Sequence, residues 1–108
     1  MPTFDHLENY TRGWVVGNFS PSIFNLKECE IGISSHRKNE STIPHRHNHS
    51  TEINIVLSGA ILVNGQKLKS GDIFIYHKLE VSNVKFLKNS TICIIRVPSS
   101  PNDKEIIL

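Results

Sequence analysis

The stretch "PHRHNHSTEINIVLSG", Pro44 to Gly59, contains three histidines at alternate positions and a glutamate three residues after the last of them. Residues i, i+2 and i+4 of a β-strand face the same side. His45, His47 and His49 therefore project together if one strand carries all three. The residues that follow, "TEINIVLSG", alternate polar and apolar side chains as a half-buried strand does. This stretch predicts a β-rich protein with a polar cluster on one strand face.

Length and composition place the chain among single-domain globular proteins. It has 108 residues, of which 38% are hydrophobic and 20% are charged. No apolar run approaches the length of a membrane helix, and the N-terminus lacks the basic and apolar regions of a signal peptide. We therefore expect a cytoplasmic protein that does not bind membranes, with Cys29 and Cys93 as buried thiols. The net charge of +2 is small and evenly spread, which argues against nucleic-acid binding.

Strand signals recur about every 8 to 12 residues, which is typical of a β-sandwich or barrel. They lie in the segments 28–34, 51–59, 60–68, 70–77, 82–89 and 90–98. Asn64-Gly65 is a strong hairpin signal within the third segment. Only "TFDHLENYTRG" has helical character, and we expect a helical turn there with Thr3 as N-cap and Gly13 as its end. The sequence predicts an all-β domain.

The histidine stretch has the chemistry of a metal site. Imidazole nitrogens are the commonest protein ligands of transition metals, and a nearby carboxylate completes a nitrogen and oxygen donor set. Glu52 follows "NHST", which we expect to form a tight turn that returns Glu52 toward the same cavity. The alternative is a solvated strand edge that is rich in histidine.

The pattern His45-x-His47-x4-Glu52-x6-Gly59 resembles the first signature motif of the cupins, G-x5-HxH-x3,4-E-x6-G. Asn39 stands at the leading glycine position, and asparagine tolerates the left-handed conformation that such a turn needs. The resemblance covers about residues 28–97. It implies one cupin domain over residues 1–108, with a double-stranded β-helix (jelly-roll barrel) and a short N-terminal segment.

The second cupin motif is only half present. The Gly71-Asp72 turn remains, but the proline and glycine that cupins carry after the next strand are absent. Ser82 stands where cupins place a fourth metal-binding histidine. The resemblance therefore points to a subgroup of uncharacterised small cupins with a degenerate second motif. The opening "GWVVGNFSPSIF" also resembles small bacterial and phage cupins of unassigned function.

The resemblance implies a divalent transition metal (Fe, Zn, Mn or Ni) bound by His45, His47 and Glu52. Three residues are candidates to replace the missing ligand: His49, Glu80, or His77 pointing inward with Ile73 and Ile75. Alternatively, the site has lost its metal, and the cavity binds an organic molecule through its polar groups.

Several other residues have two open interpretations. Asn54 shares the expected inward face of Glu52 and either binds a ligand or is a satisfied core amide. Arg96 is either a solvated charge or an inward anchor for a carboxylate or phosphate. Trp14 either packs on the barrel edge or forms a stacking platform for a ring-shaped ligand. We expect His6 and His36 at the surface.

Three functions follow from these expectations. The first is a metal-dependent oxygenase, isomerase or decarboxylase acting on a small polar substrate, with Glu80 or His77 as the catalytic acid or base. The second is a metal-free ligand-binding or sensor module. The third is an enzyme that resembles the sugar-nucleotide isomerases among the cupins. We rank it last because the chain lacks an arginine cluster for a diphosphate.

We also expect a homodimer. Ile53, Ile55 and Leu57 form an apolar row that faces away from the expected cavity. In a small barrel, such a row needs cover from another sheet, a terminal segment or a second subunit. The apolar end, residues 106–108, is a candidate to cross to the partner.

Overall fold

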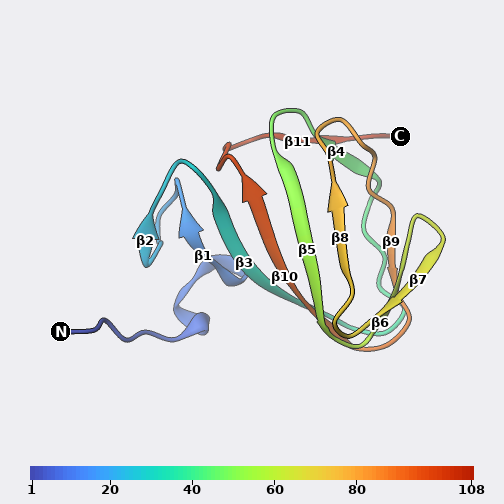
Figure 1. Cartoon of the computed structure of the whole chain (residues 1–108), viewed down its shortest axis with the longest axis horizontal. Coiled ribbons are helices and arrows are strands. Elements are labelled where there is room, and N and C mark those ends of the chain that lie inside the picture. Colours follow the sequence, from blue (N-terminus) through green and yellow to red (C-terminus); the bar gives the residue numbers. More distant parts are fainter.

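The computed structural model describes residues 1–108, and its regular secondary structure is almost entirely β-strand (Figure 1). Two short 3-10 turns, η1 (Leu7–Asn9) and η2 (Thr11–Gly13), come first. The strands are β1 (Trp14–Gly17), β2 (Phe24–Asn25), β3 (Glu30–His36), β4 (His45–His47), β5 (Thr51–Ser58), β6 (Ala60–Val63), β7 (Gln66–Lys69), β8 (Ile73–Tyr76), β9 (Val84–Phe86), β10 (Ser90–Val97) and β11 (Lys104–Ile106). The predicted all-β class is confirmed. With helical segments of only three residues each, the chain contains no helix that could span a bilayer.

The N-terminal helical turn differs from its prediction at its start. The N-cap of η1 is His6 and not Thr3, because the His6 Nδ1 accepts a hydrogen bond from the Glu8 N–H at 3.1 Å. The segment ends at Gly13, as predicted. Gly13 has φ +80°, and a Cβ there would lie 1.9 Å from the carbonyl oxygen of Ile33, so the chain can pass β3 at this point only as glycine.

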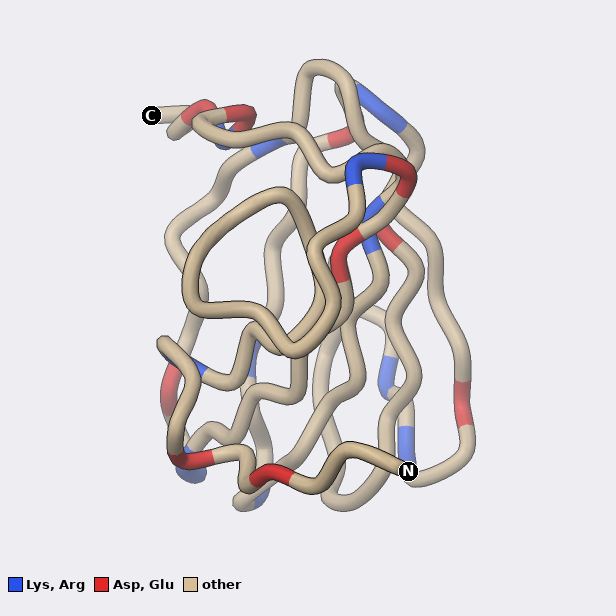
Figure 2. Tube along the Cα trace, turned by 90° about the vertical axis from the view of Figure 1, so that its left-hand side faces the viewer, with Lys and Arg blue, Asp and Glu red and all other residues tan.

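Three sheets make up the domain. Six strands form the largest sheet in the order β2-β1-β3-β10-β5-β8, a second sheet has the order β7-β6-β9, and β11 pairs with β4. The hydrogen-bonded ladders of these sheets do not join into one closed barrel. The core lies between the first two sheets and consists of Val56, Ile61, Tyr76, Val84, Phe86 and Ile92. Lysine and arginine are interspersed with acidic residues along the chain trace in Figure 2, which agrees with the small net charge.

The pairing register assigns each residue of the large sheet to one of two faces. On β5, Glu52, Asn54 and Val56 are buried, whereas Ile53 and Ile55 lie on the opposite, partly exposed face. The predicted orientation of this strand is therefore confirmed.

The strand β8 shows the same alternation, with Phe74 and Tyr76 on the inner face. Ile73 and Ile75 are 63% and 47% exposed. The alternative in which these two isoleucines point inward together with His77 is therefore wrong.

Two predicted turns have the backbone that the sequence indicated. Asn64 and Gly65 have φ of 46° and 86° and connect β6 to β7. Asn39, at the position of the cupin glycine, has φ 75°. Asparagine therefore replaces glycine at this turn and keeps the left-handed conformation.

Candidate functional site

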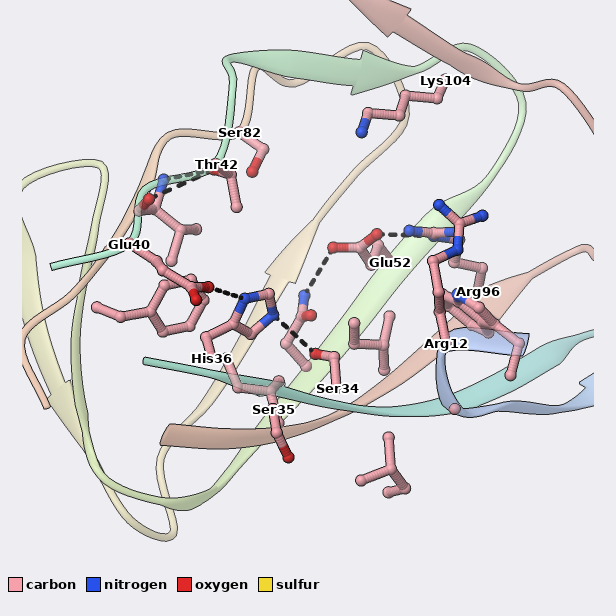
Figure 3. A pocket seen from close by; sticks show the side chains of 18 of the residues that line it. Arg12, Ser34, Ser35, His36, Glu40, Thr42, Glu52, Ser82, Arg96 and Lys104 are labelled. Carbon is pink, nitrogen blue, oxygen red and sulfur yellow. Dashed lines mark hydrogen bonds and ion pairs between the residues drawn. The ribbon is translucent and has the colours of Figure 1, made fainter. Parts of the chain in front are cut away.

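The larger of the two main cavities has a volume of about 780 Å³ and opens beside the N-terminal segment. Figure 3 shows polar side chains from several strands pointing into it. They include Arg12, Ser34, His36, Glu40, His45, Glu52, Asn54, Ser82, Arg96 and Lys104. The volume falls in the range that holds a small organic molecule.

His45 and His47 are both buried because they occupy alternate positions of β4. The Nδ1 of His45 donates to the carbonyl oxygen of Ile43 at 2.7 Å, which leaves Nε2 with a lone pair. Burial lowers the pKa of His45 despite that hydrogen bond, so the neutral imidazole is favoured. The two imidazole rings meet edge to face, with centroids 5.4 Å apart.

His47 has an unusual environment for a buried histidine. Its Nε2 lies 3.2 Å from Oε2 of Glu52, and its Nδ1 lies 3.9 Å from Oδ2 of Asp103. Neither nitrogen makes an aligned hydrogen bond, although both are fully buried. Buried polar atoms are normally paired, so His47 is an exception whose nearest polar neighbours are the carboxylates of Glu52 and Asp103.

Glu52 is buried on β5 and is surrounded by donors. Burial alone would raise its pKa, but the adjacent His47 imidazole and the Arg96 guanidinium outweigh burial and lower the pKa to about 2. Asn54 donates to Oε1 of Glu52 at 3.2 Å. Glu52 is therefore a carboxylate at neutral pH.

Arg96 faces inward, and not toward solvent. Its Nε donates to Oε2 of Glu52 at 2.8 Å, and its Nη1 lies 3.9 Å from Oε1 of Glu30. The guanidinium stacks over the ring of Trp14 at 4.5 Å. Because Arg96 pairs with the carboxylates of Glu52 and Glu30, its guanidinium compensates their negative charge and is not a free anchor for an anionic ligand.

His49 lies outside the cavity, because β4 ends at His47. Asp103 accepts hydrogen bonds from the backbone N–H groups of Asn48, His49 and Ser50 at 3.1, 2.9 and 2.9 Å. These hydrogen bonds lower the pKa of Asp103, although burial opposes them. The carboxylate turns the chain after β4, so the His49 side chain is exposed. The structure does not bring His49 to the candidate metal ligands.

Comparison with known proteins identifies the architecture. No protein-family model matches the chain, and no curated protein is similar to it in sequence. Among solved structures, an uncharacterised protein with a double-stranded β-helix domain from Klebsiella pneumoniae has a TM-score of 0.71 at 16% identity, over 95% of this chain and 89% of that one. KdgF from a Halomonas species has a TM-score of 0.66 at 20% identity, over 70% and 74% of the two chains.

A cupin-2 domain protein from Shewanella frigidimarina has a TM-score of 0.56 at 18% identity, over 67% of this chain and 72% of that one. An oxalate oxidase in complex with the substrate analogue glycolate has a TM-score of 0.63 at 16% identity, over 74% and 46% of the two chains. The chain has the cupin fold. The resemblance carried by the first motif is thereby confirmed for the fold.

Within this fold, Ser82 lies in the cavity wall beside His45. The two residues form an isolated β-bridge, in which the Ser82 N–H donates to the His45 carbonyl at 2.7 Å. Ser82 is buried. The position at which the cupin pattern has its fourth histidine is therefore next to the other candidate ligands, and it carries a hydroxyl group.

Glu80 and His77 do not reach the cavity. Both side chains are exposed, and Oε1 of Glu80 accepts the N–H of His77 at 2.7 Å to close the turn after β8. Neither the predicted acid/base role nor the replacement of the missing ligand fits this placement.

Sequence reasoning missed the cavity position of His36, whose side chain lines the cavity wall and is 29% exposed. The alternation of β3 could have indicated this, because Glu30, Gly32, Ser34 and His36 share one face. The register of β10 then places that face toward the cavity.

The donor chemistry of the cavity suits a divalent transition metal, although no three His, Cys, Asp or Glu side chains cluster closely enough to hold one in the present arrangement. The hydrogen bond from His45 to a backbone carbonyl is the usual device that orients a metal-binding imidazole. His47 has unpaired buried nitrogens, and Glu52 is ionised beside it. His45, His47 and Glu52 therefore have the donor types of a metal site without its close arrangement, and Arg96 pairs with the Glu52 carboxylate.

Proposed function

We propose that this cupin binds a divalent transition metal (Fe, Zn, Mn or Ni) through His45, His47 and Glu52, and a small polar molecule beside the metal. The observation that carries the proposal is the buried His47 ring, whose two nitrogens lack hydrogen bonds although Oε2 of Glu52 lies 3.2 Å away. A metal ion held by His47 and Glu52 would give one of these nitrogens a partner.

The small polar molecule is the substrate or ligand of the proposal. A bound divalent metal polarises a ligand oxygen as a Lewis acid. In this chain Ser82 in place of histidine leaves space beside His45 for such an oxygen. The structurally similar oxalate oxidase binds glycolate, a small carboxylic acid, which supports a ligand of this size. If the protein is an enzyme, the candidate reactions are oxygenation, isomerisation and decarboxylation, and the polar side chains that line the cavity would select among them.

Metal content tests the proposal directly. Purified protein is analysed for Fe, Zn, Mn and Ni, and compared with the double variant His45→Ala/His47→Ala and with His49→Ala. The double variant should lose the metal while its circular dichroism spectrum stays that of a β-protein. His49→Ala, which removes an exposed imidazole, should retain it. Unchanged metal content in the double variant would remove this site from consideration.

A metal-free ligand-binding or sensor module is the second candidate, and the Arg96–Glu52 ion pair at 2.8 Å favours it. Arg96 already compensates the negative charge of Glu52, so this carboxylate does not need a metal cation to balance its charge. Calorimetric titration with glycolate, before and after chelator treatment, separates the candidates. Binding that survives complete metal removal supports the metal-free module, and binding that requires added metal supports the first proposal.

We further propose a homodimer that forms through the outer face of the large sheet. The register pairs Ile31, Ile95, Ile53 and Ile75 in one row across β3, β10, β5 and β8. The next row on this face contains Ile33, Cys93, Ile55 and Ile73. Two adjacent apolar rows across four strands resemble one half of a sheet-to-sheet interface.

The dimer is tested by charge at its most exposed positions. Ile73→Lys/Ile75→Lys should convert a dimer into a monomer of about 12 kDa, as measured by light scattering at micromolar concentration. Ile43→Lys is the matched control, because Ile43 is 62% exposed outside this face. A monomeric wild type would overturn the proposal. Within one chain, Ile106 of the C-terminal tail pairs with His45.

A further inference from the structure

A second group of reactive side chains lies in the cavity wall, apart from the candidate metal ligands. The Nε2 of His36 lies 3.2 Å from Oγ of Ser34, and its Nδ1 lies 3.1 Å from Oε2 of Glu40 (Figure 3). All three residues line the cavity. We propose that Ser34, His36 and Glu40 form a nucleophilic centre, in which His36 activates the Ser34 hydroxyl toward acyl and phosphonyl electrophiles.

The hydrogen-bond chemistry assigns the roles of the two imidazole nitrogens. A carboxylate can only accept, so the contact with Glu40 requires the proton on Nδ1. Nε2 of the neutral ring is then an acceptor, and the Ser34 hydroxyl donates to it. Nucleophile, base and orienting carboxylate are connected in the order that serine hydrolases use.

The His36 ring is held in place on its face as well as at its edges. It stacks on Phe86 with centroids 4.1 Å apart and planes 9° from parallel. Phe86 is buried in the core, and its backbone N–H donates to the carbonyl oxygen of Glu40 at 2.9 Å. Phe86 therefore holds both the His36 ring, which is the proposed base, and the backbone of Glu40, which orients that base. Such prior positioning is what a catalytic base needs.

Ser34 and His36 are neighbours because of strand geometry. They lie two residues apart on β3, and the register pairs them with Ile92 and Ser90 on the inner side of β10. Ser35 lies between them on the opposite face, where its Oγ contacts Oγ1 of Thr91 at 3.3 Å. The chain therefore provides an adjacent serine without a histidine partner as an internal control.

The proposed reaction is a transfer from an ester or a related electrophile to Ser34. The Oγ attacks the carbonyl carbon, its proton moves to Nε2 of His36, and the Glu40 carboxylate stabilises the imidazolium. The bond to the leaving oxygen breaks, and that oxygen takes the proton from Nε2. Water, deprotonated by the same nitrogen, then releases the acid and restores Ser34. No metal and no redox partner enters this sequence, so it goes beyond the proposed function and does not depend on it.

A fluorophosphonate probe tests the centre without knowledge of the natural substrate. Ser34 Oγ forms a bond to phosphorus, the P–F bond breaks, and fluoride leaves with the hydroxyl proton. Intact mass and peptide mapping should show one adduct, at Ser34. Ser34→Ala should abolish it, whereas Ser35→Ala should react at the wild-type rate. A folded wild type without an adduct at Ser34 overturns the proposal.

Two further variants test the base and the residue that positions it. His36→Phe keeps a ring against Phe86 but removes both nitrogens, and the labelling rate should fall about a hundredfold. His36→Gln provides the same test if the phenylalanine variant is unstable. An unchanged rate in either folded variant would show that His36 is structural. Glu40→Gln should allow the other neutral tautomer of His36, visible in the 15N chemical shifts, and slow the labelling. Unchanged shifts would remove Glu40 from the centre.

Discussion

The Nε of Arg96 donates a hydrogen bond to Oε2 of Glu52 at 2.8 Å, in the cavity where the cupin pattern implies that Glu52 binds a metal. The same carboxylate oxygen faces Nε2 of His47 at 3.2 Å. A metal shared by His47 and Glu52 would therefore have to compete with a guanidinium at close range.

Removal of the Arg96 charge should strengthen metal binding. Arg96→Met keeps the apolar stem over Trp14 but frees the Glu52 carboxylate and removes a repelling cation. We expect zinc affinity to rise about tenfold, which corresponds to about 1.4 kcal/mol, in a competition titration against a chelator. Arg46→Met, which removes an exposed ion pair with Glu105, is the control. Weaker binding in Arg96→Met would mean that Arg96 positions Glu52 for the metal.

Glu52 should make the metal-free protein sensitive to acid. The pKa of Glu52 is about 2 in the folded protein, against 4.5 for a solvent-exposed glutamate. A lowered folded pKa stabilises the protein above pH 4.5, and this contribution is lost as pH falls from 4.5 through 2. The contribution at neutral pH is roughly 3 kcal/mol. Urea unfolding in the presence of chelator should therefore show a gap between wild type and Glu52→Gln that narrows below pH 4.5. A gap that is constant from pH 7 to 2 would contradict the assignment.

Restoration of the missing imidazole should increase metal affinity. Ser82 forms a β-bridge with His45 and lies in the cavity wall, so Ser82→His adds a donor beside the candidate ligands. We expect tighter zinc binding by about tenfold or more. Chelator competition measures the difference between wild type and variant. Equal affinities would indicate that another group already occupies this coordination position. Ser70→Ala, on the surface near Leu57, serves as a neutral serine control.

Replacement of Asp103 should destabilise the protein, because this carboxylate holds the turn that ends β4. Its side chain accepts from three backbone N–H groups in the turn after β4. Asp103→Ala leaves these donors without partners and should destabilise the protein by about 3 kcal/mol. Glu28→Ala removes an exposed carboxylate and should change stability by less than about 0.5 kcal/mol. Chemical denaturation measures both, and similar values for the two variants would contradict the role of Asp103.

Local patterns predicted the architecture well. The alternation after Thr51 placed Glu52 and Asn54 inside, and Asn64-Gly65 and Asn39 marked turns with left-handed residues. These features depend on neighbours in the sequence, where periodicity and turn chemistry act directly. The resemblance to the first cupin motif predicted the jelly-roll fold, because the residues of that motif form two neighbouring strands and the turn between them.

The contents of the cavity were harder to predict, because they depend on contacts between residues far apart in the sequence. Asp103 ends β4 from a position more than fifty residues away, and this exposes His49. Arg96 turned inward because the register of β10 aligns it with Glu30 and Glu52. No local sequence pattern predicts the contact of Asp103 with the turn after β4 or the contacts of Arg96 with the two glutamates. The position of His36 was easier to predict. The sequence shows that His36 and Ser34 share one face of β3, but it does not show which face of β3 points to the cavity.

The attachment of β4 has a consequence for hydrogen exchange. Its ladder partner is β11, a three-residue strand whose side chains are all exposed, and its other edge has only the bridge between His45 and Ser82 and the hydrogen bond from the Leu79 N–H to the His47 carbonyl. By contrast, β5 lies between two partners in the large sheet. The two short strands can detach together while the core stays intact, and their amides should exchange with solvent well before those of β5 and β10. His45 and His47 therefore lie on a strand that opens before the core does, and a group that binds them also slows the opening of that strand.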